Sequence, residues 1–218
     1  MTSRFTHEGG VAGYAVRMVE ALQAAKSQVP AWLGLFVEEI RPRAKGVKTA
    51  EFEVLCFWDR EAEFAAFDGV VATEAGYIDK AEIVWVTCDP TRIDLGKPCG
   101  FAFGKTCTCR VFTRSDEEAK AVGTQSGAEA KRTSGAFVRD REPRYRLLTS
   151  HWRAVPMTEL QALRVYAALA KGGDPSPFLS ARQIELGRRG RRRRIEVGVR
   201  RFLLADADYG VRARTRFA

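Results

Sequence analysis

The sequence predicts a mixed α/β or α+β fold, in which a mixed sheet is flanked by helices and a basic C-terminal extension follows. Runs of β-branched and aromatic residues of strand length alternate with amphipathic segments of helical period. The composition, 45% hydrophobic and 29% charged, is sufficient for a folded core. Almost all of the net charge of +9 lies near the C-terminus. We therefore divide the 218 residues into a body (1–174) and an extension (175–218).

Four segments account for the first part of the body. Residues 10–26 repeat apolar side chains at spacings of three and four, which predicts an amphipathic helix. The mostly apolar run 32–40 is compatible with a strand, and the Pro, Gly and charged residues of 41–46 predict a loop. Residues 52–58 are β-branched and aromatic, as in a buried strand.

The next segments predict a crossover connection. Residues 60–75 suit a helix, and 83–86 form the clearest strand pattern of the chain. With the strand at 52–58, they read as a βαβ unit and hence as a parallel pair of strands. Residues 106–112 alternate between apolar and polar side chains and predict a further strand.

Capping boxes mark three later helices. A Ser or Thr stands three residues before a Glu or Gln at 115–118, 158–161 and 180–183, the pattern that begins a helix. Residues 136–149 predict a hairpin around the turn Asp140-Arg141-Glu142-Pro143. Residues 194–217 alternate again, so they form either a β-hairpin with one basic face or a disordered tail.

The order of these elements resembles the thioredoxin-like fold. A strand, a helix, a strand, a helix, a hairpin and a helix follow one another, and Phe57-Trp58 is similar to the start of that family's active-site turn. No Cys-x-x-Cys motif follows Trp58, and Thr133-Ser134-Gly135 stand where the family has its cis-proline. The resemblance therefore implies the fold without the dithiol chemistry.

The extension carries the strongest functional signal. It has 12 Arg, no Lys and four acidic residues, whereas the other 174 residues carry 24 basic and 23 acidic side chains. Arginine forks bind phosphate in a bidentate manner. We expect the extension to dock a polyanion, in the first instance nucleic acid, with an acidic protein or a solvated tail as alternatives. The candidate residues are Arg188, Arg189, Arg191, Arg192, Arg193, Arg194, Arg200, Arg201, Arg212, Arg214 and Arg216.

The cysteines suggest a rival function. On a strand, Cys107 and Cys109 would place their sulfurs on one face, about 7 Å apart. With Cys88 and Cys99 they could form a four-cysteine zinc site, or act as redox thiols. The plainer interpretation is a set of incidental thiols, with Cys56 and Cys88 in the core. No cofactor is predicted, and zinc is the one metal that this pattern suggests.

The remaining motifs favour a protein without catalysis. Residues 100–106 resemble a phosphate-binding loop, but the first Gly is one position late and a strand pattern follows. His151 lacks a recognisable catalytic partner motif. Asp59, Glu61 and Glu63 could bind a metal or act as acid and base, yet they are expected to face water near a helix start. An enzyme whose site the sequence does not reveal is the second alternative.

The sequence also bears on location. It contains no apolar run of 18 residues, which argues against a transmembrane helix, and its first residues do not form the apolar core of a secretory signal. An odd number of cysteines is typical of a reducing compartment. We therefore expect a cytoplasmic protein.

Overall fold

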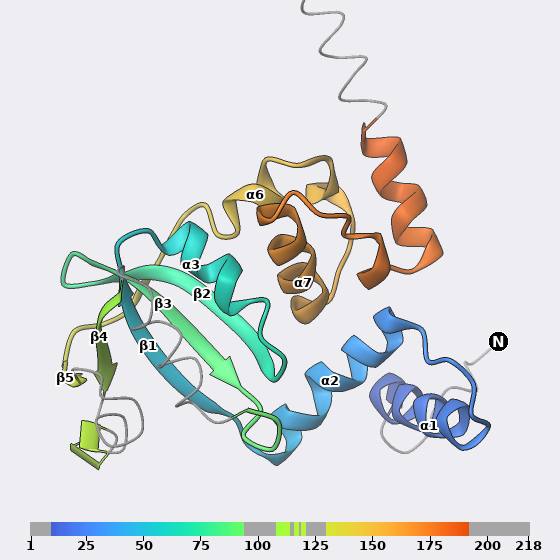
Figure 1. Cartoon of the computed structure of the whole chain (residues 1–218), viewed down its shortest axis with the longest axis horizontal. Coiled ribbons are helices and arrows are strands. Elements are labelled where there is room, and N and C mark those ends of the chain that lie inside the picture. The colour runs from blue at the N-terminus through green and yellow to red at the C-terminus, as the bar shows by residue number, and fades with distance from the viewer. Residues whose placement is uncertain (1–9, 94–107, 114–115, 118, 121–129, 192–218) are drawn as a thin grey trace, which may run out of the picture.

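A computed structural model describes residues 10–93, 108–113, 116–117, 119–120 and 130–191, and it confirms a mixed sheet flanked by helices (Figure 1). Six strands form one sheet in the order β5-β4-β1-β3-β2-β6. The β4–β5 pair is parallel and the other neighbours are antiparallel. The strands are β1 (Lys48–Val54), β2 (Val70–Ile78), β3 (Ala81–Cys88), β4 (Thr108–Thr113), β5 (Ala130–Arg132) and β6 (Val138–Arg139).

The predicted parallel pair within 52–86 is wrong. Helix α3 (Phe57–Phe64) is short, and residues 70–78, predicted in part as the end of a helix, form β2. Gly69, at φ +86°, turns the chain from the end of the helical segment into this strand. β3 then returns as a hairpin and lies between β1 and β2, antiparallel to both.

The prediction for the N-terminal segments is confirmed in part. The expected first helix is α1 (Gly10–Ala24). The strand and the loop predicted over 32–46 are wrong, because α2 (Ala31–Lys45) is helical over almost all of this stretch. A short apolar run does not distinguish a strand from a helix by itself, and here the tertiary packing decides.

Helix α2 packs in two directions. Leu33 and Val37 cluster with Ala15 and Val19 of α1, so the two helices form a pair beside the sheet (Figure 1). Leu35 belongs to the main core under the sheet. Pro42 lies in the last turn of α2, so its missing N–H costs the helix a bond only near its end.

After β6, the described part of the chain forms helices and 3₁₀ turns. The hairpin predicted over 136–149 is wrong, because β6 pairs with β2 and the second arm is helix α6 (Tyr145–Leu148). The predicted helix after residue 158 is confirmed as α7 (Glu159–Ala170), with its capping box formed by Thr158 and Gln161. The 3₁₀ turns η1 (His151–Ala154) and η2 (Ser176–Phe178) and a helix over 181–191 complete the fold.

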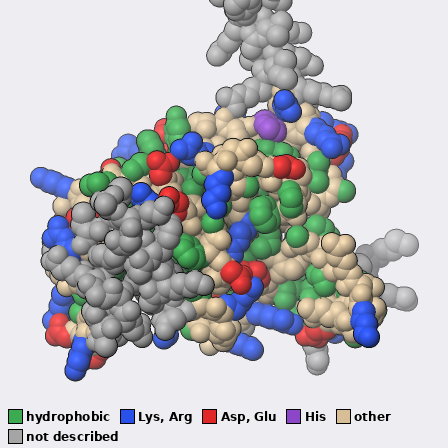
Figure 2. Space-filling view, viewed as in Figure 1, with side chains coloured by type: hydrophobic (Ala, Val, Ile, Leu, Met, Phe, Trp, Pro, Cys, Tyr) green, Lys and Arg blue, Asp and Glu red, His purple; other side chains and the backbone are tan. Residues whose placement is uncertain are grey.

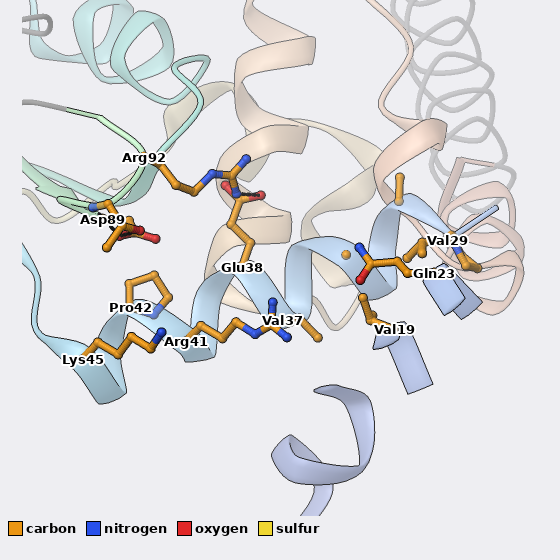
Figure 3. Close-up of a pocket in the computed structure, with 14 residues that line it drawn as sticks. Val19, Gln23, Val29, Val37, Glu38, Arg41, Pro42, Lys45, Asp89 and Arg92 are labelled. Carbon is orange, nitrogen blue, oxygen red and sulfur yellow. Dashed lines mark hydrogen bonds and ion pairs between the residues drawn. The ribbon is translucent and has the colours of Figure 1, made fainter. Parts of the chain in front are cut away.

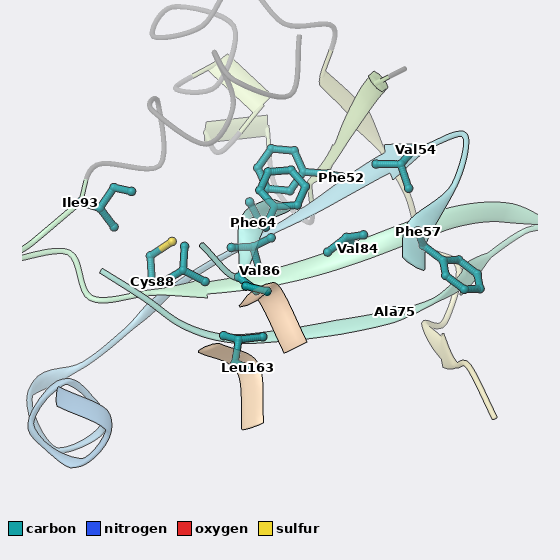
Figure 4. Close-up of a cluster of buried hydrophobic side chains, with 14 of the residues drawn as sticks. Phe52, Val54, Phe57, Phe64, Ala75, Val84, Val86, Cys88, Ile93 and Leu163 are labelled. Atoms are coloured by element: carbon teal, nitrogen blue, oxygen red, sulfur yellow. The ribbon is translucent and has the colours of Figure 1, made fainter. Parts of the chain in front are cut away.

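The main core lies between the sheet and helices α3 and α7 (Figure 4). Phe52 of β1 stacks on Phe64 of α3 with ring centroids 4.7 Å apart, and both are fully buried. Leu163 brings α7 to the same cluster. Each such side chain contributes about 1.5–3 kcal/mol to the stability through its burial.

A buried arginine joins α7 to α2 and to the turn after α3. Arg164 of α7 donates to the carbonyl oxygens of Phe67 at 2.8 Å and Val70 at 3.2 Å. It also pairs with Glu38 of α2 at 3.2 Å. These bonds connect α7 to α2 and to the backbone of the turn after α3 through one buried side chain.

No helix in the described part of the chain is both long and apolar enough to cross a membrane.

Candidate functional site: a basic helix and a buried glutamate pocket

The helix over 181–191 is anchored to the body. Ser180 begins it with the predicted capping box, since its hydroxyl and backbone N–H both donate to Oε1 of Gln183, at 2.9 and 2.8 Å. Gln183 in turn donates to Oε1 of Gln161 at 3.0 Å. At Gly187 the helix touches Trp152 so closely that a Cβ atom would lie 2.1 Å from the indole. Packing and hydrogen bonds therefore both hold this helix.

The anchored helix presents arginines to solvent. Arg182, Arg188, Arg189 and Arg191 are exposed, and Figure 2 shows basic side chains beside the point where the chain leaves the described body. Glu185 is the one acidic residue over 181–191, and it pairs with Arg189 at 3.0 Å. The described end of this helix is therefore strongly basic.

The other predicted arginines cannot be placed in this way. The hairpin or tail predicted over 194–217 lies outside the described residues, as do Arg192, Arg193, Arg194, Arg200, Arg201, Arg212, Arg214 and Arg216. Their involvement in binding stays a prediction.

The cysteines are placed only in part. Cys88 is fully buried in β3, as expected of a core thiol. Cys56, expected in the core, is exposed at the start of α3, because β1 ends before it. Cys99, Cys107 and the side chain of Cys109 lie outside the described residues, so the zinc site stays a prediction. Within the described part of the chain, no group of three or more His, Cys, Asp or Glu could hold a metal ion.

The acidic residues at the start of α3 differ in their surroundings. The expectation that they face water suits Asp59, which is 57% exposed and pairs with Arg146 at 2.7 Å. Glu63 is about one-third exposed and pairs with Arg60. The expectation is wrong for Glu61, which is fully buried against the sheet. The helical period directs Glu61 toward the sheet, whereas Asp59 and Glu63, two positions away on either side, face solvent.

Burial makes the Glu61 carboxyl group a weaker acid than an ordinary glutamate. Its pKa rises from 4.5 to about 7, because burial disfavours the charged carboxylate. The nearby charge of Arg144 opposes this rise, as do the hydroxyl of Thr73, which donates to Oε1 at 3.1 Å, and the backbone of Arg144. Atom Oε2 is also buried, and no described residue forms a hydrogen bond of ordinary geometry with it. A carboxyl group with such a pKa can exchange a proton near neutral pH.

Glu61 lines a cavity of about 380 Å³ at the β2–β6 edge of the sheet. Three arginines and three glutamates contribute to its walls, together with Thr73, Pro143, Leu147 and Leu148. Arg139 pairs with Glu74 at 2.8 Å, and Arg144 lies 3.8 Å from Glu159. Atom Nε of Arg144 is buried without a hydrogen-bond partner in the described part of the chain. We call this cavity the Glu61 pocket.

The chain over 140–145 forms one wall of the Glu61 pocket and is firmly held. Arg144 adopts a left-handed backbone conformation, at φ +54°, directly before α6. Nε1 of Trp58 donates to Asp140 at 3.2 Å, and the Trp58 ring stacks on Tyr145 with centroids 4.8 Å apart. These contacts place the Arg144 side chain next to α3.

A larger cavity, of about 570 Å³, lies between α1, α2 and the end of β3 (Figure 3). Glu38 and Arg92 point toward one another across it and pair at 2.9 Å. Arg41 pairs with Glu20 at 2.9 Å. Most of the charged side chains that line this larger cavity are thus engaged in interactions that support the fold. We therefore consider it a weaker candidate for a functional site than the Glu61 pocket.

His151 is not among the residues that line either cavity in the described part of the chain. His151 lies in η1 with its ring 4.7 Å from the ring of Trp152, beneath the helix over 181–191. The segment 100–106 lies outside the described residues.

Sequence reasoning missed the Glu61 pocket. The one available signal was the spacing in α3, where Phe57, Glu61 and Phe64 recur on one helical face. No known relative guides the assignment, since neither a scan of protein-family models nor a search of curated proteins gives a match to this chain. The thioredoxin-like resemblance therefore stays a prediction.

Proposed function

We propose that this protein is a binding module that docks a polyanion, most directly nucleic acid, through its arginine-rich C-terminal extension. The observation that carries the proposal is the exposed basic end of an anchored helix, with Arg188, Arg189 and Arg191 at the start of the arginine-rich sequence. Because this helix is held against the body, the three charges have a defined position.

The charge distribution supports the same proposal. The body is almost neutral, so a polyanion has little reason to bind elsewhere on it by charge alone. Arginine is used throughout the extension, and its planar fork suits phosphate better than lysine does. Aromatic residues are few there, which favours contacts to the phosphate backbone over stacking on bases.

The experiment that tests the proposal replaces the three helix arginines by glutamine in the full chain. Binding of a labelled duplex oligonucleotide is measured by fluorescence anisotropy over a series of salt concentrations. Each phosphate contact contributes about 0.9 to the log–log salt slope, so we expect the slope to fall by about 2.7. Between about 50 and 150 mM salt, the triple variant should lose about 20-fold less affinity than the unchanged protein.

A matched control removes the same charge from the body. Arg17, Arg132 and Arg141 are exposed on other elements, and their triple glutamine variant should keep the original slope. Equal slopes for all three proteins, or a flat salt dependence of the unchanged protein, would contradict the proposal. Tighter binding to a poly-glutamate peptide than to the duplex would favour an acidic protein as the partner.

A further inference from the structure

An exposed aromatic surface lies where β2 and β6 meet the start of α3. Tyr77 of β2 and Val138 of β6 are register partners, so their side chains are neighbours, and both are exposed, Val138 by 62%. Phe57 lies beneath them and meets the rings of Tyr77 and Trp58 edge to face, with centroids 5.3 and 5.7 Å apart. Trp58 stacks in turn on the exposed ring of Tyr145. Exposed apolar side chains that adjoin one another in this way mark interaction sites. We call Tyr77, Val138, Trp58 and Tyr145 the Tyr77 surface.

Two carboxylates flank the Tyr77 ring on the same face of the sheet. Glu82 of β3 is the register partner of Tyr77 on its other side. Asp140 follows Val138 by two positions, and its backbone N–H donates to the carbonyl of Ala75 at 2.9 Å, which continues the pairing with β2. Side chains two positions apart on a strand point to the same face. Burial and the charges of Asp140 and Glu82 raise the pKa of Tyr77, so both carboxylates act on this one group.

Each carboxylate uses one oxygen inside the fold and leaves the other accessible. Oε2 of Glu82 accepts from the backbone N–H of Phe57 at 2.9 Å, and Oδ2 of Asp140 accepts from Nε1 of Trp58 at 3.2 Å. Oε1 of Glu82 and Oδ1 of Asp140 form no hydrogen bond with a described residue and keep contact with solvent. The Tyr77 surface therefore presents two accessible acceptors, each held in place by the bond of its neighbouring oxygen.

The charge at this surface favours a cationic partner. The arginines of β6 and α6 pair with other acids, Arg139 with Glu74 at 2.8 Å and Arg146 with Asp59 at 2.7 Å. In the described part of the chain, neither of the two flanking carboxylates forms an ion pair. Their charges repel phosphate and attract a guanidinium group, which also binds favourably to an aromatic ring.

We propose that the Tyr77 surface binds a basic peptide segment of a partner protein, in which an arginine stands beside an aliphatic residue. The arginine side chain lies against the exposed Tyr77 ring and donates to Oε1 of Glu82 or Oδ1 of Asp140. The aliphatic neighbour packs on Val138 and Tyr145. Tyrosine and arginine are among the residues that contribute most to the energy of protein interfaces. This surface is separate from the basic helix, so the proposal does not depend on polyanion binding.

The test measures binding of a labelled, capped peptide, Leu-Arg-Leu-Arg-Leu, to the full chain by fluorescence anisotropy at about 50 mM salt. Because the chain has a net charge of +9, overall electrostatics oppose this peptide, and saturable binding requires a local acidic site. Replacing both arginines of the peptide by citrulline keeps their shape and removes their charge. We expect the citrulline peptide to bind at least about fivefold more weakly.

Variants of the protein connect the binding to the Tyr77 surface. Val138→Lys places a positive charge on it and should weaken binding about fivefold or more, whereas Val11→Lys, at a similarly exposed position on α1, should leave the affinity unchanged. Glu82→Gln and Asp140→Asn remove a charge but retain an oxygen for the internal hydrogen bonds, and each should weaken binding about threefold. Glu117→Gln removes an exposed charge elsewhere and should have no effect.

Several results would overturn the proposal. These are the absence of saturable binding up to about 1 mM, a citrulline peptide that binds as tightly as the arginine peptide, or equal affinities of Val138→Lys and Val11→Lys. Self-association of the unchanged chain that Val138→Lys abolishes in analytical ultracentrifugation would overturn it in favour of a second copy. An affinity that rises at least about fivefold when Arg200 and Arg201 are replaced by glutamine would overturn it in favour of the chain's own arginines.

Discussion

Replacing Glu61 by glutamine should change how the stability of this protein depends on pH. The folded protein holds the Glu61 proton more tightly than the unfolded chain does, because burial raises the pKa from 4.5 to about 7. As pH rises between these two values, the unfolded state releases this proton first and becomes relatively favoured. The free energy of unfolding of the unchanged protein should therefore fall as pH rises through this window.

The size of the effect follows from the two pKa values. A rise from 4.5 to about 7 corresponds to about 3 kcal/mol of stability lost between acidic and neutral pH. The glutamine side chain of the variant has a similar shape, can still accept from Thr73 and does not ionise. We expect the variant to gain about 3 kcal/mol relative to the unchanged protein between about pH 4 and pH 8.

Urea denaturation followed by tryptophan fluorescence at a series of pH values measures this difference. Other titrating groups are common to both proteins and cancel when the two curves are subtracted. Glu63→Gln is the matched control, because Glu63 lies two residues away at the surface, and its difference curve should stay within about 0.5 kcal/mol. A Glu61→Gln difference that is constant with pH, or that changes in the opposite direction, would refute this reasoning.

Four further predictions concern packing, a buried arginine and thiols. Gly187→Ala should destabilise the protein by about 1–3 kcal/mol in thermal or urea unfolding, because its Cβ would overlap the indole beneath it. Gly34→Ala in α2, whose Cβ would meet only Val29 at 3.9 Å, should instead stabilise it slightly. Arg164→Met should cost about 2–3 kcal/mol, since it leaves Glu38 with Arg92 as its ion-pair partner and removes a charged donor from the carbonyls of Phe67 and Val70, and a loss below about 1 kcal/mol would contradict this role. In the native protein, Cys56 should react rapidly with a maleimide and Cys88 only after unfolding, which mass spectrometry of the labelled peptides would show.

The parts of the fold that could be predicted from sequence are those that local interactions determine. The capping boxes at Thr158 and Ser180 form between residues three positions apart, so the pattern contains all that the structure uses. The strand β3 is clear in the sequence because its β-branched run is short and bounded on both sides. The choice between strand and helix for 32–40 depends on α1 and the sheet, which a local window does not include.

The Glu61 pocket shows why a site can escape such reasoning. Glu61 is close to two surface acids, and all three are ordinary residues for the first turns of a helix. Its raised pKa comes from burial in the fold, against the opposing effects of Thr73, 12 residues away, and of Arg144, which the β6–α6 connection brings back to α3. The pairing of β6 with β2, which the hairpin prediction did not include, brings Arg144 close to α3.

The two candidate sites also share a structural element. Leu147 lines the Glu61 pocket and packs in the cluster that contains Trp152, Leu179 and Ile184, the seat of the basic helix. Arg153 of the pocket follows directly after Trp152, against which Gly187 of that helix is pressed. An occupant that moved Leu147 would therefore disturb the apolar cluster against which the basic helix packs. By thermodynamic reciprocity, a polyanion that shifted the helix would alter the affinity of the pocket by the same factor.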